Sequence, residues 1–137
     1  MSDFPTEVQA IIGPQLSTMG FVLDQIDDPT DEGGRPLSVV YYRGSDAKIQ
    51  IYKSSREGET NCMIGPLDAP NEFGLRSKSK KWQYFTRFVP RPDLPLDQLT
   101  QMARTEYESY ETPLFWVRSR IEKYYEAAHT GILQRYK

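Results

Sequence analysis

The chain has 137 residues, of which 38% are hydrophobic and 12% aromatic, and a formal net charge of −2. This length suits one domain with a single core, so we predict one domain over residues 1–137. No apolar run approaches the roughly 18 residues of a membrane-spanning helix. The single cysteine excludes an internal disulfide framework. The first ten residues lack the basic and apolar regions of a secretory signal, so we expect a cytoplasmic protein.

The charges are distributed unevenly along the chain. Residues 1–34 carry seven acids and no lysine or arginine, whereas residues 35–137 hold all 17 bases and 12 acids. Within the second part, residues 73–92 contain six bases and no acid. Such asymmetry concerns surface fields and partners rather than the fold. Two interpretations stay open: these segments contact charged partners, or each is simply solvated by one charge sign.

The N-terminal segment has the pattern of a helix. Thr6 is suited to be its N-cap, with Gln9 three residues later as in a capping box. Apolar residues follow at helical spacing: Val8, Ile11, Ile12 and Leu16. Gly20 fits the position just beyond the helix end. Pro14 removes one backbone hydrogen bond, which predicts either a kink or two short helices.

Five β-type runs separated by turn residues come next. They cover residues 21–26, 37–43, 47–53, 60–65 and 81–89. In the third run, Ile49 and Ile51 alternate with Lys48, Gln50 and Tyr52, which predicts a strand with one solvated face. Residues 66–80 are predicted to be a loop. Sequential short strands favour an antiparallel meander.

The pattern becomes helical from Leu96 onward. A first apolar stripe contains Leu96, Leu99, Met102, Ala103, Tyr107 and Tyr110. Thr112 and Pro113 suit the N-cap and first position of a second helix, which we expect to end at Gly131. The complete prediction is an α+β fold with an N-terminal helix, an antiparallel sheet of four to five strands, and two C-terminal helices packed on one sheet face.

The stretch "LDQIDDPTDEGGRP" (residues 23–36) concentrates the acidic charge. We predict that "DDPTDEGGRP" forms an acidic hairpin loop, longer than the usual two to five residues. A calcium loop starting at Asp28 would need a glutamate where Val39 stands, so that interpretation fails. We propose a partner-binding surface in this loop, and a plain solvated loop is the equal alternative. The candidate residues are Asp27, Asp28, Asp31 and Glu32.

Few residues suggest catalysis or metal binding. One histidine and one cysteine cannot form a zinc site. Cys62 lies within a strand and is interpreted as a small core residue, and His129 lies near a helix C-terminus that favours its charged form. No phosphate-binding glycine motif or nucleophile elbow occurs. We therefore expect no catalytic residue, metal or cofactor. The alternative is a carboxylate-based enzyme, whose mark would be a pocket lined by two or more acids.

The segment 76–91, "RSKSKKWQYFTRFVPR", interleaves bases with aromatic residues. Proteins that bind single-stranded nucleic acids use this combination, which makes a nucleic-acid-associated accessory protein another alternative. The net negative charge opposes it, and we interpret Trp82, Tyr84 and Phe88 first as core residues. One of the neighbours Phe115 and Trp116 is expected at the surface. The basic and aromatic candidates for partner binding are Arg76, Lys80, Lys81, Trp82 and Trp116.

The order of short segments resembles a known group of proteins. These segments are "IIGPQLSTMGFVL", "VVYYRGSDAKIQIY", "REGETNCMIG", "KKWQYFTRF" and "LDQLTQMARTEYESYETPLF". They are similar to a loose group of small uncharacterised bacterial orphan proteins, some regarded as immunity proteins, and the resemblance covers most of residues 8–116. It implies an α+β fold without catalytic residues and transfers no site residue. We therefore expect a non-enzymatic protein-binding module, with neutralisation of a basic toxin domain by direct contact as its specific form.

Overall fold

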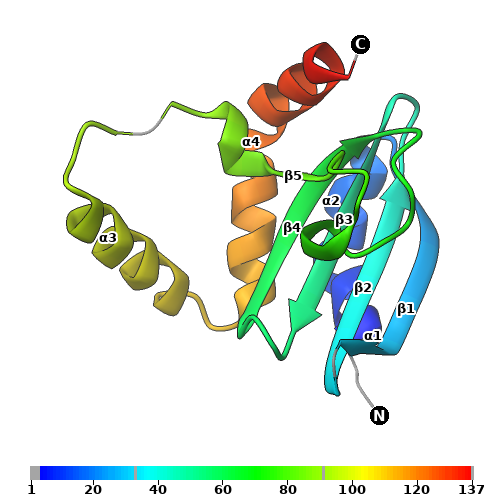
Figure 1. The fold of residues 1–137 in the computed structure, drawn as a ribbon, viewed down its shortest axis with the longest axis horizontal. Helices are drawn as coiled ribbons and strands as arrows, with labels where there is room; N and C mark the ends of the chain where they lie inside the picture. Colours follow the sequence, from blue (N-terminus) through cyan, green and yellow to red (C-terminus); the bar gives the residue numbers. More distant parts are fainter. Residues whose placement is uncertain (1–3, 33, 91, 137) are drawn as a thin grey trace.

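The computed structural model describes residues 4–32, 34–90 and 92–136, without the side chains of residues 29–32. The helices are α1 (Phe4–Ile11), α2 (Gly13–Thr18), α3 (Leu96–Glu108) and α4 (Pro113–Arg135), with the short 3-10 helices η1 (Gly74–Arg76) and η2 (Phe85–Phe88). The strands are β1 (Val22–Glu32), β2 (Arg35–Arg43), β3 (Ala47–Ser54), β4 (Glu59–Pro66) and β5 (Gln83–Tyr84). Within the described residues the strands form one antiparallel sheet in chain order (Figure 1). The predicted α+β fold class and the meander are confirmed.

Helices α1, α2 and α4 cover one face of the sheet (Figure 1). Their apolar residues recur three or four positions apart and so share one side of each helix. From the helices, the buried residues include Val8, Ile12, Leu16, Leu114, Val117, Ile121, Ala128 and Ile132. From the sheet, they include Val40, Tyr42, Ile49, Ile51, Cys62 and Ile64. Each fully buried aliphatic side chain contributes about 1.5–3 kcal/mol relative to an exposed one, so this layer is the main core.

The N-terminal segment forms the two short helices that Pro14 allows. Helix α1 already begins at Phe4, so Thr6 lies in its first turn and is not the predicted N-cap. Proline is tolerated in the first turn of α2, because that amide would lack an intrahelical partner anyway. Gly20 follows with a φ of +88°, a conformation that side chains with a Cβ resist. Its amide donates to the Ser17 carbonyl at 3.0 Å, as expected at a helix C-terminus.

The other sheet face is buried too, which the sequence did not predict. Lys48, Gln50 and Tyr52 of β3 point to this face, and Lys48 is only 4% exposed. The prediction of a solvated face is therefore wrong. The segment between β4 and β5, including η1, lies over this face of the sheet (Figure 1), and its Ala69 and Phe73 share a buried cluster with Tyr52. We call residues 66–82 the cover segment.

Backbone groups of the cover segment satisfy the buried polar side chains of β3. The Lys48 ammonium donates to the Ala69 carbonyl at 2.8 Å. The Gln50 amide donates to the Glu72 carbonyl at 3.0 Å and accepts from the Gly74 amide at 3.0 Å. Buried polar groups are stable when hydrogen-bonded in this way. The lysine and glutamine therefore fix the cover segment to the sheet.

Trp82 ends the cover segment and fills the second core. Its indole Nε1 donates to the Pro70 carbonyl at 2.8 Å, and its ring lies 6.1 Å from that of Tyr41. The chain then crosses the sheet edge, because Phe85 is buried on the helical side. Only Gln83 and Tyr84 pair with β4, so the predicted strand over residues 81–89 is much shorter than expected.

Helix α3 differs from α4 because none of its described residues is buried. Leu96 is 70% exposed and Met102 is 55% exposed. The ring of Tyr107 packs edge-on against Trp116 of α4, with centroids 4.8 Å apart. Figure 1 shows α3 standing away from the sheet. The prediction that both C-terminal helices pack on the sheet face is therefore correct for α4 and wrong for α3, which contacts α4 instead.

Helix α4 continues through Gly131, so the predicted helix end there is wrong. The glycine has another role, because a Cβ at this position would lie 2.2 Å from Cδ1 of Phe88. His129, in the preceding turn, has its Nε2 2.8 Å from Oδ1 of Asp46 and stacks on Tyr125. These contacts tie the last turns of α4 to η2 and to the β2–β3 turn.

Candidate functional site

The acidic stretch forms a strand rather than a loop. Strand β1 runs to Glu32 and β2 begins at Arg35, so two residues separate them. The predicted ten-residue acidic loop is therefore wrong. Carboxylates and proline are depleted in strands, which is why the composition suggested a loop. The structure places Pro29 on an edge strand, where the register shifts between Asp27 and Thr30, and a missing amide is tolerated at such a bulge.

Asp27 and Asp28 are consecutive in β1 and point to opposite sheet faces, as successive strand residues do. On the side of the cover segment, Asp27 accepts a hydrogen bond from Tyr41; burial raises the pKa of Tyr41, and the charge and hydrogen bond of Asp27 raise it further. On the helical side, Asp28 accepts a hydrogen bond from the Ser38 hydroxyl. Asp31 and Glu32 belong to β1, and their side chains lie outside the described residues.

The outer edge of β1 has no strand partner among the described residues, since the strand pairs with β2 alone. Three apolar residues near its start are exposed: Val22, Leu23 and Ile26. Asn71 of the cover segment reaches this end and donates to Asp24 at 2.9 Å and to Gln25 at 3.1 Å. An unpaired edge presents backbone donors and acceptors that another extended chain can use.

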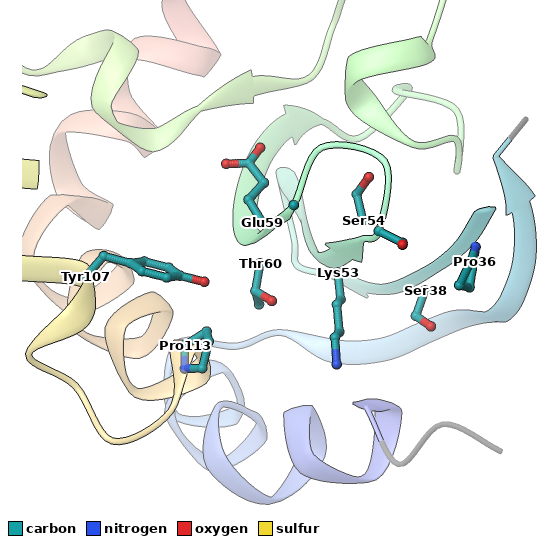
Figure 2. A pocket seen from close by; sticks show the side chains of 10 residues that line it. Pro36, Ser38, Lys53, Ser54, Glu59, Thr60, Tyr107 and Pro113 are labelled. Carbon is teal, nitrogen blue, oxygen red and sulfur yellow. The ribbon is translucent and has the colours of Figure 1, made fainter. Parts of the chain in front are cut away.

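A cleft of about 510 Å³ lies at the start of β2, the end of β3 and the start of β4. Its lining includes Ser38, Lys53, Glu59, Thr60, Tyr107 and Pro113 (Figure 2). Ser38 joins the cleft to the acidic strand through its hydrogen bond to Asp28. Tyr107 comes from α3 and Pro113 from the start of α4, so the helical region closes one side of it.

Three lining residues form one polar row across the sheet, which we call the polar row. Ser38 pairs with Lys53, and Lys53 pairs with Thr60. Directly opposed residues on neighbouring strands have Cβ atoms about 5 Å apart, so the three side chains are neighbours. Figure 2 shows them on the same side of the sheet. The parallel rows beneath the helices are apolar: Val40–Ile51–Cys62 and Tyr42–Ile49–Ile64.

Glu59 points to the opposite face and is held by two tyrosines. Its Oε1 accepts from the Tyr52 hydroxyl at 2.5 Å and from the Tyr84 hydroxyl at 3.1 Å. Burial and the hydrogen bond to Glu59 raise the pKa of Tyr52 far above its ordinary value, and burial raises the pKa of Tyr84 to about 12. This cluster joins β3, β4 and β5. Glu59 is the one acid among the described residues that line this cleft. Glu122 and Glu126 both line a second cavity of about 630 Å³, so the carboxylate-based alternative stays a prediction.

The predicted basic and aromatic residues do not form one surface. Arg76 and Lys80 are exposed, while Lys81 pairs with Asp68 at 2.6 Å. Trp82 and Trp116 are both buried, so neither is displayed for contact. The interpretation of Trp82 as a core residue is confirmed. Nucleic-acid binding by this segment would need exposed aromatic rings on which bases can stack. Trp82 and Phe85 are both buried, so fewer rings of the segment are exposed for stacking than its composition suggests.

Cys62 lies inside the main core, as predicted, and burial raises the pKa of its thiol to about 12. A thiol reacts as its thiolate, and access is needed as well. We expect the folded protein not to react with Ellman's reagent at about pH 8, and to react at a rate set by unfolding when urea is added. Fully unfolded protein, which should show one thiol per chain, is the control. Fast reaction before unfolding would contradict the core position.

Comparison with known proteins gives no relative. The chain matches no protein-family model, and no curated protein or solved structure is significantly similar to it. Within the part of the chain that is described, no group of three or more metal-ligating side chains occurs. No described helix has the length and apolar character required to cross a bilayer. Function must therefore be argued from the geometry of β1 and of the cleft.

Proposed function

We propose that the protein is a non-enzymatic binding module that holds a basic, extended segment of another protein along strand β1. One observation carries this proposal: an edge strand of eleven residues contains five acids and no base. An edge strand binds an extended segment through backbone hydrogen bonds. Its carboxylates favour a basic partner and speed the encounter. The exposed Val22, Leu23 and Ile26 add apolar contact near one end.

The same carboxylates oppose pairing with a second copy of this chain. Two β1 strands side by side would bring like charges into opposition, which is destabilising across a strand pair. Charged residues and bulges on edge strands are common protections against self-association. The favoured partner is therefore a different, basic protein. A basic toxin domain is such a partner, which agrees with the immunity-type group that the sequence resembles.

Charge reversal on β1 tests this proposal. The probe is a fluorescent peptide of about ten residues that alternates lysine and valine, long enough to cover one strand. We expect Asp31→Lys with Glu32→Lys to weaken its binding by about tenfold or more and to reduce the dependence of binding on salt. Fluorescence anisotropy at low and moderate salt measures both effects. Asp27 and Asp28 are left unchanged because both accept hydrogen bonds within the fold.

Two controls distinguish an effect of charge on β1 from an effect of the net charge of the protein. Asp97→Lys with Glu108→Lys makes the same change in net charge on exposed positions of α3, and binding should weaken by less than about twofold, since charges beyond a Debye length are screened. A glutamate–valine peptide should not bind the unmodified protein. Equal loss in both double variants, or binding of the acidic peptide, would rule out β1 as the contact strand.

A further inference from the structure

We propose that the cleft beside the polar row is a separate binding site for a small ligand with an anionic head, a carboxylate or a phosphate, and an apolar body. Lys53 supplies the charge. Among the described residues its ammonium has no carboxylate within ion-pair distance, because the ion pairs there join Lys81 to Asp68 and His129 to Asp46. A lysine in a concave site without an ion pair is suited to an anion.

Thr60 provides the second observation. The residue is 6% exposed and makes no side-chain hydrogen bond among the described residues, but its hydroxyl is not one of the described buried polar atoms that lack a partner, so solvent reaches it from the cleft. A hydroxyl with this access is free to donate to a ligand oxygen. The side chain lies beside Lys53 in the polar row and lines the cleft (Figure 2). A ligand oxygen placed against Lys53 can accept a hydrogen bond from this hydroxyl.

The start of α4 borders the cleft and favours the same charge. Thr112 is its N-cap residue, but the Thr112 side chain makes no capping hydrogen bond. Pro113, the next residue, lines the cleft. The first amides of a long helix carry partial positive charge and attract anions. The Lys53 ammonium, the Thr60 hydroxyl and the N-terminus of α4 therefore all favour an anionic ligand group.

The surroundings define the rest of the ligand. Pro36, Tyr107 and Pro113 provide apolar wall, and Trp116 supports the Tyr107 ring. A volume of about 510 Å³ falls within the range of roughly 300–1,000 Å³ typical of small-molecule sites. Two acids are near. The Asp28 carboxylate accepts a hydrogen bond from the Ser38 hydroxyl. The Glu59 carboxylate lies on the other face of the sheet, where it accepts hydrogen bonds from two tyrosine hydroxyls. An aromatic or branched aliphatic body suits this cleft.

A matched series of probes tests the site by backbone amide NMR titration of the folded protein. The probes are 3-phenylpropionate, phenyl phosphate, the neutral 3-phenylpropanol and the cationic phenethylamine. We expect at least one of the two anions to shift the amide resonances of Ser38, Lys53 and Thr60 at low millimolar concentration. The neutral alcohol and the cationic amine should bind about tenfold more weakly than that anion or not at all. The anion that binds better identifies the head group. No shift with either anion up to about 10 mM would overturn the proposal, because a built site of this size should bind more tightly than that.

Variants separate a built site from general charge attraction. Lys53→Gln should reduce the affinity for the anionic probe by about tenfold, and Thr60→Val by a few-fold, because valine keeps the shape and removes the hydroxyl. Lys78→Gln, an exposed lysine on the cover segment, is the matched control and should have no effect. Thermal melting confirms that each variant is folded. If the Lys53→Gln variant binds the anion as tightly as the unmodified protein does, the proposal is also wrong. Failure of either anion test leaves the proposal of peptide binding at β1 unaffected.

Discussion

Replacing Trp82 by alanine is expected to lower the free energy of unfolding by about 3–5 kcal/mol and to release the cover segment from the sheet. The indole is 3% exposed, packs near Tyr41, and holds the Pro70 carbonyl through its N–H. Without it, the cover segment would be held by the hydrogen bonds of Lys48 and Gln50 and by those from Asn71 to β1. Urea denaturation measures the loss of stability, and hydrogen exchange should show protection falling first over residues 66–82.

The two tryptophans offer a matched comparison for the hydrogen bond of Trp82. Trp82→Phe removes a donor that has a partner, whereas Nε1 of Trp116 is buried and has no partner among the described residues. Trp82→Phe removes one of the two hydrogen bonds that the Pro70 carbonyl accepts, the other coming from the Glu72 amide at 2.8 Å. It should therefore destabilise the protein by about 1 kcal/mol more than Trp116→Phe, which removes no hydrogen bond. Equal effects would mean that the bond to Pro70 does not stabilise the cover segment.

Gly131→Ala is expected to destabilise the protein by about 1–3 kcal/mol, although alanine normally stabilises a helix interior by about 1 kcal/mol relative to glycine. The added Cβ would lie 2.2 Å from Cδ1, 2.5 Å from Cγ and 2.9 Å from Cβ of Phe88. These atoms include Cβ of Phe88, which does not move when the side chain rotates, so rotation alone cannot relieve the overlap. Thermal or urea unfolding measures the effect.

The Phe88→Ala background provides the control for this steric argument. Phe88→Ala removes the overlaps with Cδ1 and Cγ and leaves only the 2.9 Å contact with Cβ at position 88, so Gly131→Ala should be much less destabilising in this background than in the unmodified protein. A double-mutant cycle should therefore show strong coupling between positions 88 and 131. Absence of coupling would mean that the glycine is not required by the close contact between α4 and η2.

Periodicity predicted the parts of the fold that depend on local sequence. Val8, Ile12 and Leu16 recur at helical spacing, and Ile49 and Ile51 at strand spacing, and all five are buried in the main core. Pro14 and Gly20 are local signals too, since their effects follow from the ring and from the missing Cβ. The α+β arrangement follows from such signals.

The second sheet face could not be predicted because its burial depends on distant residues. Lys48 and Gln50 have the pattern of a solvated strand face, and their partners are backbone groups of Ala69, Glu72 and Gly74. The cover segment itself has no periodicity that would reveal its packing. Side-chain hydrogen bonds to a distant backbone leave no regular pattern in the sequence.

The candidate site was predicted in composition but not in geometry. The acids of β1 were identified, whereas their strand conformation depends on the edge position that tolerates Pro29. The polar row was missed because Ser38, Lys53 and Thr60 come together only through strand register. Each replaces an apolar residue in the core-facing alternation of its strand, and this common exception is the signal that could have revealed the row.

Helix α3 buries none of its described residues and reaches the main core only through partly buried side chains such as Tyr107, so the protein has parts of unequal local stability. A 13-residue helix is marginal in water without packing, and α3 buries none of its described residues. It can therefore open and re-form while the sheet and α4 stay intact. Proteolytic cleavage, inserted sequence and circular permutation are tolerated best in such regions. The chain between η2 and α4 is consequently the place where this fold can accept new sequence with least disturbance to β1 and the second core.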